Sequence, residues 1–177
     1  MKVLMIGDVV GSPGRDAVRT LVPQIKKREA IDFVVANAEN AAGGTGVTPR
    51  IVNDLLNAGC DVLTTGDHIW RRHEVFDIID TETRLLRPLN LPEASPGKGY
   101  CVYTSASGVA IAVVSLLGRV FIDAMTSSPF IAIREILPCL KQKTNTILVD
   151  FHAEATSEKI AMGWFLDGEV SCVVGSH

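Results

Sequence analysis

Five short apolar runs in this chain each lead into a side chain that can bind a metal ion or transfer a proton. Short apolar runs bounded by polar residues are typical of strands that are buried on both faces of a parallel sheet. Because the carboxyl ends of parallel strands share one edge, we expect the side chains that follow these runs to converge there. The pairs are residues 3–6 with Asp8, residues 33–36 with Glu39 and Asn40, residues 61–65 with Asp67 and His68, residues 147–149 with His152, and residues 170–174 with His177.

The composition is that of one α/β domain. Of the 177 residues, 47% are hydrophobic and 21% are charged, which suffices for a single domain over residues 1–177 with a substantial core. The mean hydropathy of +0.25 leaves room for a homo-oligomer interface. A formal net charge of −3, without a long Lys/Arg run, argues against binding nucleic acid through bulk electrostatics. A small phosphorylated substrate is compatible with this charge.

The chain lacks the sequence signals of secretion or membrane insertion. Met1 opens directly into a strand that Asp8 interrupts, and the longest apolar run, residues 109–117, is too short to span a bilayer. The cysteines have neither Cys-x-x-Cys spacing nor a clustered framework, so we interpret them as reduced core residues. They are Cys60, Cys101, Cys139 and Cys172. We expect a cytoplasmic protein with no membrane association.

Helical spacing of apolar residues predicts helices between the strands. In the last helix, a stripe that contains Ile160 and Trp164 is expected to face the core. Residues 99–104 and 109–116 predict an antiparallel hairpin added to the parallel strands, which makes the sheet mixed. The first expected helix begins near Gly14, and the others cover residues 48–58, 70–80, 129–141 and 153–166.

Three segments allow more than one interpretation. The glycine-rich residues 39–46 suit either a flexible turn or a backbone that passes close to another group. Arg71, Arg72 and His73 suit either a substrate phosphate or a solvated first helical turn. Residues 84–97 contain three prolines and little periodicity, which in a compact domain indicates a lid, a rim or an interface.

Carboxylate, amide and imidazole donors without thiolate suit divalent Mn, Fe or Zn, and six such ligands exceed what one ion takes. We therefore expect two ions, about 3.5 to 4 Å apart, that hold a phosphoryl group. Glu39, which follows a middle strand, is the natural bridging ligand. His68 lies beside a ligand without needing to be one, so it is the candidate proton donor.

Several strings together resemble the bacterial YmdB-type metallophosphoesterases over the whole chain. The resemblance implies a calcineurin-like four-layer α/β/β/α sandwich with mixed, mostly parallel sheets and a di-iron or di-manganese site. It also implies hydrolysis of cyclic nucleotides, including the 2′,3′-cyclic type, by a hydroxide that bridges the two ions. The strings are Gly7-Asp8, Asn37-Ala-Glu39-Asn40-Ala-Ala-Gly-Gly, Gly66-Asp67-His68-Ile-Trp70, Asp150-Phe-His152-Ala-Glu-Ala-Thr-Ser-Glu158-Lys and Gly175-Ser-His177. The metal ligands implied are Asp8, Glu39, Asn40, position 67, His152 and His177, with His68 as the proton donor.

Two departures from that family matter. The family has Asn at position 67 where this chain has Asp67, and the added charge is expected to bind metal more tightly and make the centre less electrophilic. The family also continues beyond His177 with Thr-His and a further segment. We therefore expect one metallophosphoesterase domain that lacks this segment, with one tightly bound ion, a weaker second position and little diesterase activity.

Two other classes of function compete with this interpretation. A dinucleotide-binding oxidoreductase needs Gly-x-Gly-x-x-Gly after the first strand, and Gly7-Asp8-Val-Val-Gly11 does not supply it. A metal-binding or nucleotide-binding regulatory module with little turnover is the serious alternative. Metal content measured together with turnover of an aryl phosphodiester separates this alternative from an enzyme.

Overall fold

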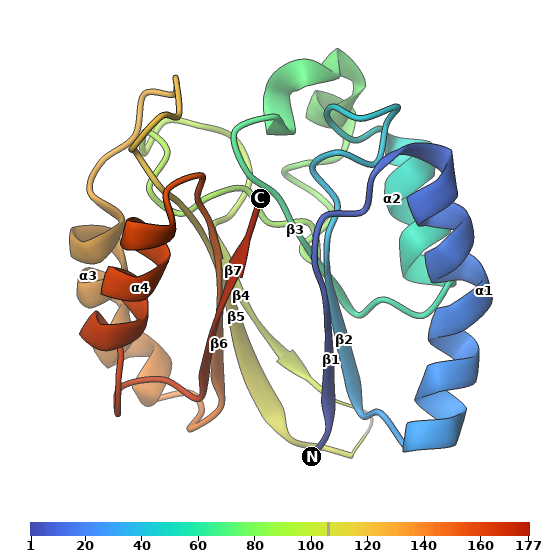
Figure 1. The fold of residues 1–177 in the computed structure, drawn as a ribbon. Helices are drawn as coiled ribbons and strands as arrows, with labels where there is room; N and C mark the ends of the chain where they lie inside the picture. Colours follow the sequence, from blue (N-terminus) through green and yellow to red (C-terminus); the bar gives the residue numbers. More distant parts are fainter. Residues whose placement is uncertain (106) are drawn as a thin grey trace.

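The computed structural model describes residues 1–105 and 107–177, and two sheets stand face to face in it with helices on both outer sides (Figure 1). The first sheet has the order β1-β2-β3, and the second has the order β4-β5-β6-β7. The first half of the chain contains β1 (Val3–Ile6), α1 (Gly11–Glu29), β2 (Phe33–Asn37), α2 (Pro49–Asn57), β3 (Val62–Thr64) and the 3₁₀ helices η1 (Ile69–Arg71) and η2 (His73–Asp77). The second half contains β4 (Tyr100–Thr104), β5 (Ala110–Leu117), α3 (Pro129–Lys141), β6 (Ile147–His152), α4 (Thr156–Phe165) and β7 (Cys172–Ser176).

The four layers confirm the predicted α/β/β/α sandwich. All strand pairs of the first sheet are parallel, and in the second sheet only the β4–β5 pair is antiparallel. The predicted hairpin is thereby confirmed. In Figure 1, α1 and α2 cover one sheet while α3 and α4 cover the other. Among the described residues, no helix is long and apolar enough to cross a membrane.

The alternation of side chains along the central strands explains the layers. In β2, Val34 and Ala36 pack toward α1 and α2, while Phe33 and Val35 pack between the sheets. In β5, Ala112, Val114 and Leu116 pack toward α3 and α4, while Ile111 and Val113 meet the first sheet. Both faces of each strand are therefore apolar, as the continuous hydrophobic runs in the sequence predict.

The predicted helix over residues 70–80 is wrong. Two short 3₁₀ helices occupy this region and meet at Arg72, whose backbone is extended (φ −114°, ψ 114°). The Arg72 guanidinium donates to the carbonyl oxygens of Ala42 (2.8 Å) and Thr45 (3.2 Å). These tertiary bonds hold the chain away from helical geometry at this residue.

The predicted orientation of the last helix is also wrong. The side chains of Trp164 and Ile160 are 78% and 57% exposed, whereas Met162 and Leu166 are buried against the second sheet. Residues four apart lie on one helix face, so burying Met162 and Leu166 turns the predicted stripe toward solvent. Cys139 and Cys172 are exposed as well, so only Cys60 and Cys101 fit the expectation of core cysteines.

Candidate metal centre

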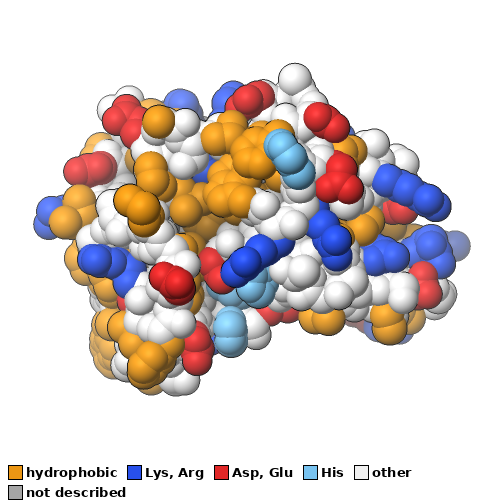
Figure 2. All heavy atoms as spheres, turned by 90° about the horizontal axis from the view of Figure 1, so that it is seen from above, with side chains coloured by type: hydrophobic (Ala, Val, Ile, Leu, Met, Phe, Trp, Pro, Cys, Tyr) orange, Lys and Arg blue, Asp and Glu red, His pale blue; other side chains and the backbone are white. Residues whose placement is uncertain are grey.

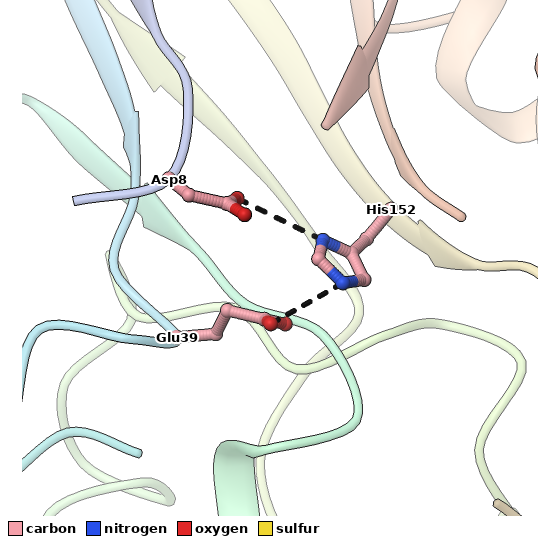
Figure 3. Close-up of side chains that lie close together, drawn as sticks. All are labelled: Asp8, Glu39 and His152. Carbon is pink, nitrogen blue, oxygen red and sulfur yellow. Dashed lines mark ion pairs between the residues drawn. The ribbon is translucent and has the colours of Figure 1, made fainter. Parts of the chain in front are cut away.

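The side chains that were predicted to converge lie together at the carboxyl edge, between the two sheets. Asp8 and Glu39 come from the loops after β1 and β2, and His152 is the last residue of β6 in the opposite sheet. Figure 3 shows the Asp8 carboxylate facing Nδ1 of the imidazole ring and the Glu39 carboxylate facing Nε2. Potential ligand atoms of these three residues all lie within 4.8 Å of one another.

The remaining predicted residues surround this group. The Asp67 carboxylate is 3.7 Å from His152 Nε2, and His177 Nδ1 is 3.4 Å from the same nitrogen. Asn40 Nδ2 donates to Glu39 Oε1 (3.2 Å). All six residues predicted as metal ligands therefore lie in one cluster, although the six come from both sheets.

His68 lies at the rim of the cluster. Its Nδ1 is 2.9 Å from Asn40 Oδ1 and 3.5 Å from Glu39 Oε1. Its Nε2 is 3.5 Å from the Asp67 carboxylate, and 32% of the side chain is exposed. The ring is oriented from within the cluster, and part of it faces solvent.

The carboxyl groups of the cluster are buried close together, which disfavours their charged forms when no cation is bound. Burial raises the pKa of Glu39 to about 9, and the carboxylates of Asp67, Asp8 and Asp150 add to this effect. Burial and the nearby Asp150 also raise the pKa of Asp8. One buried oxygen of each, Asp8 Oδ1 and Glu39 Oε2, has no hydrogen-bond partner among the described residues. Buried charges are normally paired or bound to metal, so these oxygens fit a divalent ion.

The histidine at the centre is suited to the same ion. Burial lowers the pKa of His152 to about 4, although Asp67 opposes this shift. The ring is therefore neutral near pH 7, which is the form that binds metal.

Gly66 lets the turn after β3 pass directly against the cluster. A Cβ atom at this position would overlap Glu39 Oε2 and would lie 2.6 Å from His152 Cδ2. Glycine is therefore required here, because a side chain would occupy the space of two candidate ligands.

The glycine-rich segment after Asn40 also passes close to another group, the Arg72 side chain. A Cβ atom on Gly46 would lie 2.8 Å from Arg72 Cγ, and Gly46 has a positive φ of 73°. Together with the hydrogen bonds of Arg72 to this segment, this geometry favours a structural role for Arg72 over both interpretations that the sequence left open.

A buried polar network beneath the cluster was not predicted. Asp150 is 1% exposed and accepts hydrogen bonds from Ser176 Oγ (2.7 Å), Asn37 Nδ2 (3.2 Å) and the Thr64 hydroxyl. Burial raises the pKa of Asp150, while these three donors lower it. The signal in the sequence was an acid inside an otherwise apolar strand. The network joins the two sheets directly below the candidate ligands.

Solved structures with the same architecture define the class. The chain superimposes with a TM-score of 0.92 and 41% identity on a hypothetical protein from Thermus thermophilus, over 100% of this chain and 68% of that one. It superimposes with a TM-score of 0.90 and 33% identity on a novel phosphatase from Mycoplasma pneumoniae, over 100% of this chain and 64% of that one. The fold is that of a phosphatase of calcineurin-like type.

Sequence comparison specifies the family within this class. The family model described as YmdB-like protein matches residues 4–177. The chain is 47% identical over 177 residues to the 2′,3′-cyclic-nucleotide 2′-phosphodiesterase of Bacillus subtilis (strain 168), covering 100% of this chain and 66% of that protein. The chain therefore belongs to the YmdB-like family, and it spans about two thirds of the length of this relative.

Proposed function

We propose that the protein is a metal-dependent phosphodiesterase that hydrolyses cyclic nucleotides, with the 2′,3′-cyclic type as the main substrate. The observation that carries this proposal is a pair of buried carboxylate oxygens, on Asp8 and Glu39, that have no hydrogen-bond partner in the part of the chain that the structure describes. They lie close to the neutral ring of His152. The similarity to the Bacillus subtilis 2′,3′-cyclic-nucleotide 2′-phosphodiesterase supports the same substrate class.

The residues of the cluster would hold two divalent ions. The family resemblance favours Fe or Mn over Zn. Glu39 is the proposed bridging ligand because it lies between Asn40 and His152. Bound ions would polarise the phosphoryl oxygens and lower the pKa of an attacking water. The full proposed ligand set is Asp8, Glu39, Asn40, Asp67, His152 and His177.

His68 is the proposed proton donor to the departing ribose oxygen. Its Nδ1 can donate to Asn40 Oδ1, which fixes the ring and leaves Nε2 for the substrate. Asp67 lies 3.5 Å from Nε2, so this nitrogen is beside the proposed ligands, where a general acid would meet the departing oxygen.

The test is metal content after desalting, together with turnover of 2′,3′-cyclic AMP and of bis(4-nitrophenyl) phosphate with added Mn²⁺. We expect bound metal and slow but measurable hydrolysis of both diesters, with loss of both in Glu39→Gln. Metal or nucleotide binding without turnover of either diester would instead support the regulatory module.

A further inference from the structure

A second cavity opens beside the metal centre and shares Asp67 with it. Its volume is about 560 Å³, which lies within the range of pockets that hold small ligands. Three segments line it: Trp70 and Arg71 after β3, Leu91 and Pro92 from the proline-containing segment 84–97, and Met125 from the loop after β5. Viewed from this side, hydrophobic side chains gather in a hollow beside histidine and Lys/Arg side chains (Figure 2).

The walls of this cavity are held in place by the fold. The Trp70 ring stacks on Phe76 with centroids 5.0 Å apart and an angle of 12°, so its orientation is fixed. Buried Asn90 binds both ends of the loop after β5: its Oδ1 accepts from Leu117 N (2.9 Å) and its Nδ2 donates to Ser127 O (3.0 Å). The loop after β5 and the segment 84–97 are therefore held together on this side of the cavity.

The walls of this cavity combine a cation, apolar surface and a hydrogen-bond acceptor. Arg71 is exposed, and within the described residues its guanidinium makes neither a hydrogen bond nor an ion pair with protein groups. Arg72 next to it donates to carbonyl oxygens. A cation without a protein partner beside a phosphodiester site suits a phosphate oxygen. Trp70, Leu91 and Met125 supply apolar surface for a flat ring, and Asp123 offers an acceptor for an N–H group.

We propose that this cavity binds the base of a nucleoside phosphate, with Trp70 as the stacking wall and Arg71 directed at the phosphate. This inference rests on the proposed function and deepens it, because it makes the base a recognised part of the substrate. Stacking of a base on an aromatic ring is sequence-tolerant, so the cavity would accept both purines and pyrimidines.

The chain contains two tryptophans, Trp70 and Trp164, which allows a binding test without turnover. In Trp164→Phe, only Trp70 emits, and we expect adenosine 3′-monophosphate to quench its fluorescence saturably while ribose 5-phosphate does not. In the matched variant Trp70→Phe, only the 78% exposed Trp164 emits, and we expect no quenching. Absence of nucleotide quenching in Trp164→Phe, or equal quenching by ribose 5-phosphate, would overturn the proposal.

A kinetic comparison gives a second, independent readout. Trp70→Ala is expected to lower kcat/KM for 2′,3′-cyclic AMP, relative to the base-free methyl riboside 2′,3′-cyclic phosphate, by about tenfold or more. The loss should lie mainly in KM, and Trp70→Phe should restore most of the ratio. Trp164→Ala, in helix α4, should leave kcat/KM for both substrates unchanged.

The two proposals fail in different ways. Equal losses on both substrates in Trp70→Ala would make Trp70 a structural residue and overturn the base site, while leaving the phosphodiesterase intact. Hydrolysis of neither substrate by the unaltered protein would count against the proposed function, and the fluorescence titration would still decide whether a base binds beside Trp70.

Discussion

Glu39 Oε1 lies 3.2 Å from His152 Nε2, and the side chains of both residues are 1% exposed. Glu39 follows β2 in the first sheet and His152 ends β6 in the second. This contact joins the two halves of the sandwich at the point where the candidate ions would sit. The ligand set therefore depends on how the two sheets are held against each other.

His68→Ala is expected to keep the bound metal and lose turnover by about a hundredfold or more, the usual effect of removing a general acid. His68 lies at the rim of the cluster, 32% exposed, while the proposed ligands form its interior. Elemental analysis and steady-state kinetics on the same sample check this. Metal loss in proportion to activity would make His68 a ligand instead.

Asp67→Asn is expected to weaken metal binding and to raise turnover per bound metal. The substitution removes a negative charge 3.7 Å from His152 Nε2, so the ions would polarise a phosphoryl oxygen more strongly. Metal affinity and the rate at saturating Mn²⁺ are the two quantities to compare. Unchanged or lower turnover would show that this centre is adapted to Asp at position 67.

Gly66→Ala is expected to abolish metal binding, because its Cβ atom would overlap Glu39 Oε2 and crowd His152. Gly163→Ala is the matched control: Gly163 lies in α4, and a Cβ atom there meets no other group within 4 Å. That control should gain helix stability by up to about 1 kcal/mol. Metal binding by Gly66→Ala at the unaltered affinity would contradict the crowding.

Asp150→Asn is expected to destabilise the fold by about 2 to 4 kcal/mol, because three donors then face an amide that cannot accept from all of them. The donors are Asn37, Thr64 and Ser176. Asp16→Asn, at a surface ion pair, should change stability by less than about 0.5 kcal/mol. Urea denaturation of both variants measures the difference. Equal midpoints would show that the Asp150 network does not stabilise the fold.

The metal-free protein should lose stability as pH rises from about 6.5 to 9. The pKa of Glu39 is raised from 4.5 to about 9, so the folded state binds this proton more tightly and its stabilising effect disappears as pH rises toward 9. The pKa of His152 is lowered from 6.5 to about 4, so its contribution declines only as pH falls below about 6.5. Above that pH the Glu39 effect therefore acts without opposition from His152.

Thermal unfolding in EDTA at pH 6.5, 7.5 and 8.5 tests this dependence. Glu39→Gln should flatten it, and Mn²⁺ should reverse it by stabilising the ionised carboxylate. A melting temperature that does not change with pH in EDTA would mean that the pKa of Glu39 is not raised in the metal-free protein.

The sequence by itself determined the strands, the side chains that follow them and their convergence at one edge. Apolar runs such as residues 33–36 are typical of strands that are covered on both faces, and this pattern can be recognised locally. A glycine such as Gly66 permits a close backbone approach, but the groups that it meets, Glu39 and His152, were set by the tertiary structure.

The tertiary structure decided what depends on contacts between distant residues. The sequence did not reveal that Asp150 would bind Asn37 and Thr64 of the opposite sheet, nor that Arg72 would hold the segment after Asn40. The exposure of Trp164 also followed from which face of α4 met the second sheet. Local patterns specify which side chains are apolar or polar, but only the packing of the two sheets fixes which of them meet.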